Sequence, residues 1–193
     1  FINTAGIGAI PAEIHWGAQR LAAGDVLLVS GTLGDHGAAI LNLREGLGRE
    51  GELASDCAVL TPLIQTLRDI PGVKALRDAT RGGGNAVAHE FAAASGCGIE
   101  INETALPLKP AVRGVCELLG LDALNFANEG KLVIGVDSAC AGEALARRRA
   151  QPLGRYAALI GDVVAKSGVR RNGLYGIKRT LDLPHAEPLP RIC

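Results

Sequence analysis

Residues 26–37 read Val26-Leu27-Leu28-Val29-Ser30-Gly31-Thr32-Leu33-Gly34-Asp35-His36-Gly37. The first five form a short apolar run bounded by glycines, which predicts a buried strand, and a helix is expected over 38–45 after the glycine-rich loop. The same order returns where a strand over 73–79 leads through Asp78-Ala79-Thr80-Arg81-Gly82-Gly83-Gly84 into a helix over 85–94. Strands and helices that alternate in this way indicate an α/β domain, layered as α+β.

This alternation extends over the rest of the chain. Further strands are expected over 98–102, 131–136 and 157–164, with a last strand or hairpin over 170–180. A turn of helix is expected over 15–23, and further helices over 57–67, 110–119 and 139–150. Asp56 is the expected N-cap of the helix over 57–67. Residues 1–10 are expected to be a strand, with Pro11 as its boundary.

The composition limits the class of protein. Of 193 residues, 48% are hydrophobic and 21% are charged, which provides for a packed core. Lys and Arg together number 20, as do Asp and Glu, and this balance disfavours a nucleic-acid partner held by phosphate contacts. The longest uncharged stretches, 1–12 and 26–34, are too short to span a bilayer. We therefore expect a soluble protein with neither nucleic-acid nor membrane partners.

Two further features concern the extent of the chain and its compartment. The chain contains no Met and begins at Phe1, so we expect it to be a piece of a longer protein. Its five cysteines, at positions 57, 97, 116, 140 and 193, form no C-x-x-C pair. This pattern argues against a disulfide framework and against a zinc site, and it favours a reducing cytoplasm.

The loop at 78–84 is the first segment that suggests chemistry. Its three glycines allow close backbone approach to a ligand, and the N–H groups at the start of the following helix favour an anion such as phosphate. Asp78 is a candidate ligand for a divalent metal on phosphate oxygens. The alternative is a tight turn in which Asp78 or Thr80 caps the helix.

Two other loops carry ionisable side chains. Asp35 and His36 suit acid–base or metal chemistry, the alternative being an N-cap Asp and a surface His. The segment Asn125-Phe126-Ala127-Asn128-Glu129-Gly130-Lys131 precedes a strand, where the carboxylate of Glu129 can accept a proton. The alternative is a turn capped by Asn128 and Gly130, with Glu129 in solvent.

The C-terminal segment differs in composition from the rest. It reads Leu183-Pro184-His185-Ala186-Glu187-Pro188-Leu189-Pro190-Arg191-Ile192-Cys193, and its prolines favour an extended course. From Pro184 to Cys193 the extended chain reaches roughly 30–35 Å. The Cys193 thiol is a good nucleophile that can carry an acyl or carbamoyl group.

Together these segments resemble the HypE family of hydrogenase maturation factors, the carbamoyl dehydratases. The likeness rests on residues 1–6, 30–37, 78–83, 125–131 and the terminal Pro190-Arg191-Ile192-Cys193, and it covers essentially the whole chain. The Asp-x-Thr-x-Gly-Gly element is shared more widely, with aminoimidazole ribonucleotide synthetase, selenophosphate synthetase and thiamin-phosphate kinase. Gly84 departs from the family, whose members usually carry an aliphatic residue there.

The resemblance implies a fold and its extent. We expect a three-layer α/β/α domain like the C-terminal domain of aminoimidazole ribonucleotide synthetase, with an extended tail. Residues 1–12 would be the last strand and linker of an N-terminal ATP-binding domain that also forms a homodimer. Residues 13–179 would be the α/β domain, and 180–193 the tail that ends in Cys193.

The resemblance also implies a reaction, in which an S-carbamoyl group on Cys193 is dehydrated with ATP to a thiocyanate, the source of cyanide for the iron of NiFe hydrogenase. The nucleotide phosphates and Mg²⁺ would be bound by Asp78, Thr80, Arg81, Gly82 and Gly83, with Asp78 on the metal. Glu129 would be the base, with His36 or a residue of the N-terminal domain as alternatives. The partners would be the carbamoyltransferase HypF and the HypC–HypD complex.

Two other functions stay open. A small-molecule ATP-dependent amide-activating enzyme or kinase of the same fold would have no use for the terminal Pro-Arg-Ile-Cys. A non-catalytic carrier module would only display Cys193 to its partners, and ATP hydrolysis by the chain would exclude it.

Overall fold

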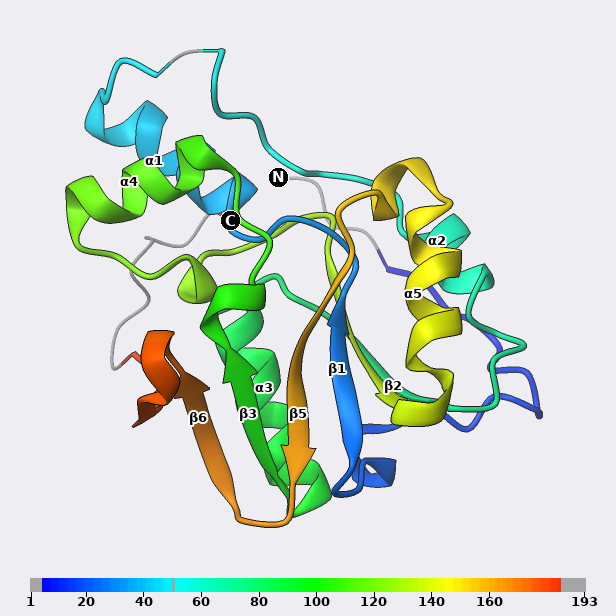
Figure 1. Ribbon diagram of the computed structural model, residues 1–193. Helices are drawn as coiled ribbons and strands as arrows, with labels where there is room; N and C mark the ends of the chain where they lie inside the picture. Colours follow the sequence, from blue (N-terminus) through cyan, green and yellow to red (C-terminus); the bar gives the residue numbers. More distant parts are fainter. Residues whose placement is uncertain (1–4, 50, 185–193) are drawn as a thin grey trace.

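The computed structural model describes residues 5–49 and 51–184, and within them the centre of the molecule is a seven-stranded mixed sheet. The strand order is β2-β4-β1-β5-β3-β6-β7 (Figure 1). The pairing of β3 with β6 is parallel, and the other five pairings are antiparallel. The strands are β1 Asp25–Val29, β2 Val73–Asp78, β3 Gly98–Asn102, β4 Leu132–Asp137, β5 Ala158–Val164, β6 Gly168–Asn172 and β7 Lys178–Thr180.

The α-helices surround the sheet unevenly. They are α1 Asp35–Glu45, α2 Thr61–Gln65, α3 Gly83–Ser95, α4 Pro110–Leu119 and α5 Ala141–Arg149. Helix α3 packs against β3 and β6 on one face, whereas α5 packs against β1, β4 and β5 on the other (Figure 1). Helices α1 and α4 contact each other and enclose a small core of their own around Phe126. No helix in the described ranges is long and apolar enough to cross a membrane.

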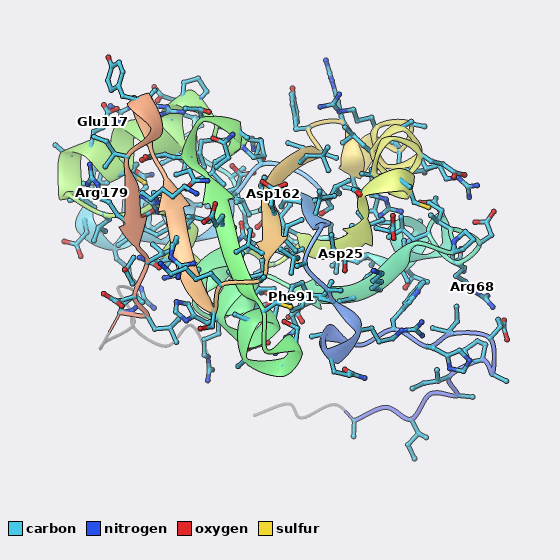
Figure 2. All side chains as sticks on the ribbon, turned by 60° about the horizontal axis from the view of Figure 1, so that its bottom comes forward. Asp25, Arg68, Phe91, Glu117, Asp162 and Arg179 are labelled. Carbon is cyan, nitrogen blue, oxygen red and sulfur yellow. The ribbon has the colours of Figure 1, made fainter. Side chains whose placement is uncertain are left out.

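Side chains alternate between the two faces of β1. Leu27 and Val29 belong to the core that contains Phe91 of α3 (Figure 2), and Leu28 belongs to the core that contains Ala141 and Ala144 of α5. Both faces of this strand are therefore buried, as its continuous apolar sequence predicts.

On β5 only the face toward α3 is buried. Ile160 and Val163 lie in the α3 core, whereas Leu159 and Asp162 point to the opposite side and are exposed (Figure 2 labels Asp162). The expected layered α/β domain is thus confirmed, with the second helical layer over β2, β4 and β1.

Most predicted elements match, and the last strand or hairpin is the hairpin of β6 and β7. The turn of helix expected over 15–23 is shorter than expected. Only the 3₁₀ turn Ala18–Arg20 forms there, because extended Gly17 donates its N–H to the Lys74 carbonyl and joins this segment to β2. Residues 5–10 form no strand, and Ile7 and Ile10 are exposed. A strand needs a neighbour to pair with.

The helix expected over 57–67 is too long. Helix α2 begins only at Thr61, with Leu60 and not Asp56 as its N-cap residue. The carboxylate of Asp56 is instead bound to residues 129 and 131. This long-range attachment removes residues 56–58 from the helix.

Candidate functional site

Three of the segments singled out in the sequence meet at the buried side chain of Asn128. Its Oδ1 accepts the Gly34 N–H at 2.8 Å, and its Nδ2 donates to the Ala79 carbonyl at 3.0 Å. The backbone N–H of Asn128 also donates to Ala79, at 3.0 Å. The loops come together because β1 and β2 end, and the antiparallel β4 begins, at the same edge of the sheet.

The loop that follows β2 is closed tightly against residues 124–126. Gly82 is the N-cap residue of α3, at φ 71°, and no side chain caps this helix. Gly83, at φ 61°, lies so close to the carbonyl oxygens of Leu124 and Phe126 that a Cβ would be 2.4 and 2.5 Å from them. Thr80 donates its hydroxyl to Asp78 at 2.6 Å. The alternative in which Asp78 or Thr80 caps the helix is therefore wrong.

A cavity of about 430 Å³ lies beside this loop. Arg77 donates to Glu90 at 2.8 Å and to Asp78 at 3.1 Å, and the hydrogen bond to Glu90 raises the pKa of Arg77 above its ordinary value. Arg77 is thus already paired with two carboxylates of the same cavity. Arg81 and the first turn of α3 are the groups there that are suited to an anion. Its lining residues are Arg77, Asp78, Thr80, Arg81, Gly82, Ala86, Val87, Glu90, Leu183 and Pro184. The lining thus includes four of the five predicted phosphate-binding residues.

Asp78 fits a role as a single ligand of a magnesium ion. Its side chain is about half exposed, and its two oxygens accept hydrogen bonds from Arg77 and Thr80. The described part of the chain contains no cluster of three or more His, Cys, Asp or Glu side chains that would suit a metal ion. Mg²⁺ on a nucleotide typically needs only one or two carboxylates besides phosphates and water.

Glu129 follows Asn128, which is hydrogen-bonded to Ala79, but Glu129 is not among the residues that line the cavity. Its N–H donates to Asp56 Oδ1 at 3.0 Å, and its carbonyl accepts the Ala58 N–H at 3.5 Å. The side chain is partly buried and has no hydrogen-bond or ion-pair partner among residues 5–49 and 51–184. The carboxylate thus remains available to a ligand.

Asp35 and His36 are both buried, so the alternative of an N-cap Asp and a surface His is wrong. The N-cap of α1 is Gly34. Asp35 is 2% exposed, accepts a hydrogen bond from Thr32 at 2.6 Å and forms an ion pair with Lys109 at 3.0 Å. The His36 Nδ1 lies 2.8 Å from the Ser55 hydroxyl. These contacts join α1 to its neighbours.

Sequence reasoning missed two attachments. Lys131 donates to Asp56 at 2.7 Å, and both side chains are almost fully buried. Asn85 donates to the Asp182 carbonyl at 3.0 Å, and the His89 Nε2 lies 2.8 Å from the Leu181 carbonyl. No local pattern could reveal either attachment, because the partners lie at least 75 positions apart in the chain.

The other predicted catalytic residue, Cys193, lies outside the described residues. The last described residues, Leu183 and Pro184, form one wall of the cavity beside Asp78. The chain therefore passes the predicted phosphate site nine positions before Cys193.

Comparison with known proteins identifies the domain. Residues 22–172 match the family described as AIR synthase related protein, C-terminal domain. The chain belongs to this family. Its whole length is 80% identical to carbamoyl dehydratase HypE of Escherichia coli (strain K12), and it covers 57% of that protein. The resemblance to the HypE proteins is thereby confirmed, and the chain spans little more than half the length of this relative.

Solved structures agree with this assignment. A crystal structure of E. coli HypE matches with a TM-score of 0.94 at 80% identity, over 96% of this chain and 58% of that one. A HypE–HypF complex matches with a TM-score of 0.84 at 40% identity, over 86% and 55%. A HypE in complex with ATP matches with a TM-score of 0.83 at 36% identity, over 90% and 54%.

Proposed function

We propose that this chain is the C-terminal part of an ATP-dependent carbamoyl dehydratase, which converts an S-carbamoyl group on Cys193 to a thiocyanate. The observation that carries the proposal is the meeting of the loop over 78–83 with the loop of Glu129 through Asn128. The loop that lines the cavity is thus joined to the loop of a carboxylate that has no partner among the described residues. The 80% identity to a carbamoyl dehydratase supports the same reaction.

The proposal includes the rest of the protein. Residues 1–12 would end and link an N-terminal ATP-binding domain, residues 13–179 form the C-terminal domain, and 180–193 carry the thiol. HypF would load the carbamoyl group, the HypC–HypD complex would take the cyanide for the iron of NiFe hydrogenase, and the full-length protein would be a cytoplasmic homodimer. A solved HypE–HypF complex, at 40% identity to this chain, supports the first of these partners.

The difficulty of the reaction lies in the oxygen that must leave the carboxamide. Hydroxide is a poor leaving group, whereas phosphate is a good one, so ATP serves as substrate. The carbamoyl oxygen attacks the γ-phosphorus, ADP leaves, and one N–H proton is lost, giving an S-linked O-phosphoryl imidate. Cleavage of its C–O bond and loss of the second N–H proton then release phosphate and leave the thiocyanate.

The residues of the site suit these two steps. Phosphoryl transfer depends mostly on positioning and on neutralising charge, for which Arg81, the Gly82–Gly83 backbone and the first turn of α3 are suited. Asp78 and Thr80 lie at the same loop, and Asp78 would hold Mg²⁺, which supplies charge neutralisation at the phosphates. Glu129 would accept the proton from the carbamoyl nitrogen.

The proposal is tested by measuring the intact mass of the full-length protein. After incubation with HypF, carbamoyl phosphate and ATP, we expect Cys193 to gain one carbamoyl group and, with further ATP, to lose one water. Glu129→Gln is expected to keep the first step and to slow the second by about 10²–10⁴-fold. The matched control is Glu117→Gln on α4, an exposed carboxylate away from the cavity. A Cys193 that gains no adduct would contradict the proposal.

A further inference from the structure

The segment 55–58 runs alongside the loop that carries Glu129. The carboxylate of Asp56 accepts hydrogen bonds from both neighbours of Gly130, namely Glu129 and Lys131. Its Oδ1 accepts the Glu129 N–H at 3.0 Å and its Oδ2 accepts the Lys131 ammonium at 2.7 Å. The Asp56 side chain is only 3% exposed, and hydrogen bonds to an ionised acceptor are stronger than neutral ones.

The two backbones also touch. A Cβ at Gly130 would lie 1.9 Å from the Asp56 carbonyl oxygen and 3.1 Å from the Ala58 Cβ. The Ala58 N–H donates to the Glu129 carbonyl at 3.5 Å, so residues 56–58 hold the peptide groups on both sides of Glu129. The backbone of Glu129 is thus fixed at both ends, while its side chain makes no polar contact with the described residues.

The holding segment is itself anchored. The Ser55 hydroxyl lies 2.8 Å from the His36 Nδ1 and accepts the Cys57 N–H at 3.3 Å. The Lys131 side chain passes so close to Gly31 that a Cβ there would be 3.0 Å from its Cε. Residues 55–57 are therefore connected to α1 and to the loop after β1, which are parts of the same site.

A buried ion pair is weak evidence for stability, because the cost of removing both charges from water offsets much of their attraction. Its better-supported effect is to specify one arrangement among several. Here that arrangement is the backbone direction at the residue proposed as the base. An error of about 1 Å in a reacting group can slow a reaction by about 100-fold.

We propose that Asp56 is a positioning residue for Glu129, acting through the Glu129 N–H and through Lys131. The inference rests on the proposed function, because it assumes that Glu129 takes the proton. It also assigns a purpose to the buried pair of Asp56 and Lys131.

The experiment uses the full-length protein already carbamoylated on Cys193 and measures the ATP-dependent loss of water. Asp56→Asn keeps an oxygen for the Glu129 N–H but removes the charge facing Lys131, and Asp56→Ala removes both. We expect Asp56→Ala to lower kcat by about 10–100-fold with an unchanged KM for ATP. Asp56→Asn should lower kcat by a smaller factor. The matched control is Glu100→Ala, which breaks an ion pair with Lys178 on β7, outside the site.

The decisive comparison combines the variants. If Asp56 acts through Glu129, Asp56→Asn causes no further slowing in a Glu129→Gln protein, whereas an independent structural role gives the same factor in both backgrounds. Equal factors would overturn the inference. If Glu129→Gln is slow but the Asp56 variants keep full activity, the positioning role of Asp56 is overturned and the role of Glu129 stands. If Glu129→Gln is fully active, the role of Glu129 is contradicted together with that of Asp56. Circular dichroism shows whether Asp56→Ala has failed to fold. In that case the kinetics of Asp56→Asn test the inference.

Discussion

The two halves of the sheet differ in how they are covered. In β4 and β1 both faces are buried, so Leu28 and Ile134 on the α5 side are as inaccessible as Leu27 on the α3 side, whereas β2 at the edge of this half ends in the exposed Arg77 and Asp78. In β5, β3 and β6 the face away from α3 carries exposed or half-exposed side chains, among them Leu159 and Asp162. The loops that meet at Asn128 all leave the first half.

This difference indicates which part of the sheet can fix the positions of site residues. A strand buried on both faces cannot slip by one residue without exposing apolar side chains, so its register and its end are fixed. Asn128 and Asp56 can then be placed to within the tolerance of a hydrogen bond. The second half depends more on surface pairs such as Glu100 with Lys178, which contribute little.

Truncating one leucine in each half gives the largest predicted effect. Leu28 and Leu159 are direct cross-strand partners on the same face, but Leu28 is fully buried and Leu159 is 37% exposed. We expect Leu28→Ala to lower the free energy of unfolding by about 2–5 kcal/mol. For Leu159→Ala we expect a change within about 0.5 kcal/mol. Urea unfolding measures both, and equal losses would mean that the two halves are equally covered in solution.

A methyl group at the closed loop should have the next largest effect. In Gly83→Ala the new Cβ would clash with two carbonyl oxygens at a residue that has a positive φ. We therefore expect the free energy of unfolding to fall by about 1–3 kcal/mol. Gly142 lies in α5, and a Cβ there meets nothing within 4 Å. Gly142→Ala should therefore raise the free energy of unfolding by about 0.4–1 kcal/mol. Thermal unfolding of the two variants tests this, and a stable Gly83→Ala protein would show that the loop can relax.

The smallest predicted effect concerns Glu100 in the half that is covered on one face. The hydrogen bond from Lys178 lowers the pKa of Glu100 below its usual 4.5. A lowered pKa in the folded protein adds stability at pH values above 4.5, and this stability is lost as the pH falls through the folded value. Glu100→Gln should lose less than about 1 kcal/mol at pH 7, with the difference from the parent shrinking as the pH falls below 4.5. Urea midpoints across this range measure it, and a constant difference would contradict the assignment.

The strands could be predicted from local sequence because buried strands such as 26–30 are apolar runs between glycines. The predicted start of the helix over 57–67 was wrong for a physical reason, since an Asp before an apolar run looks like an N-cap whether or not its carboxylate has a distant partner. Here the partners of Asp56 are Glu129 and Lys131, more than 70 positions away.

The candidate site shows the same limit. The loop over 78–83 and the loop of Glu129 were each visible as glycine-rich or acidic segments. Their contact through Asn128 was not, because it depends on the strand order β2-β4-β1, which no local pattern encodes. The burial of Asp35 and His36 likewise depends on α4 and on Ser55, which approach from elsewhere in the chain.

The attachment of Leu181 and Asp182 to α3 has a kinetic consequence. Asn85 and His89 fix the chain at a point from which eleven residues remain to Cys193. Eleven residues reach at most about 36–40 Å, so the terminal thiol stays within that distance of Asp182. A tether of this length corresponds to an effective concentration on the order of millimolar. A group carried on Cys193 would then meet its own site in a first-order step, at a rate independent of how dilute the protein is.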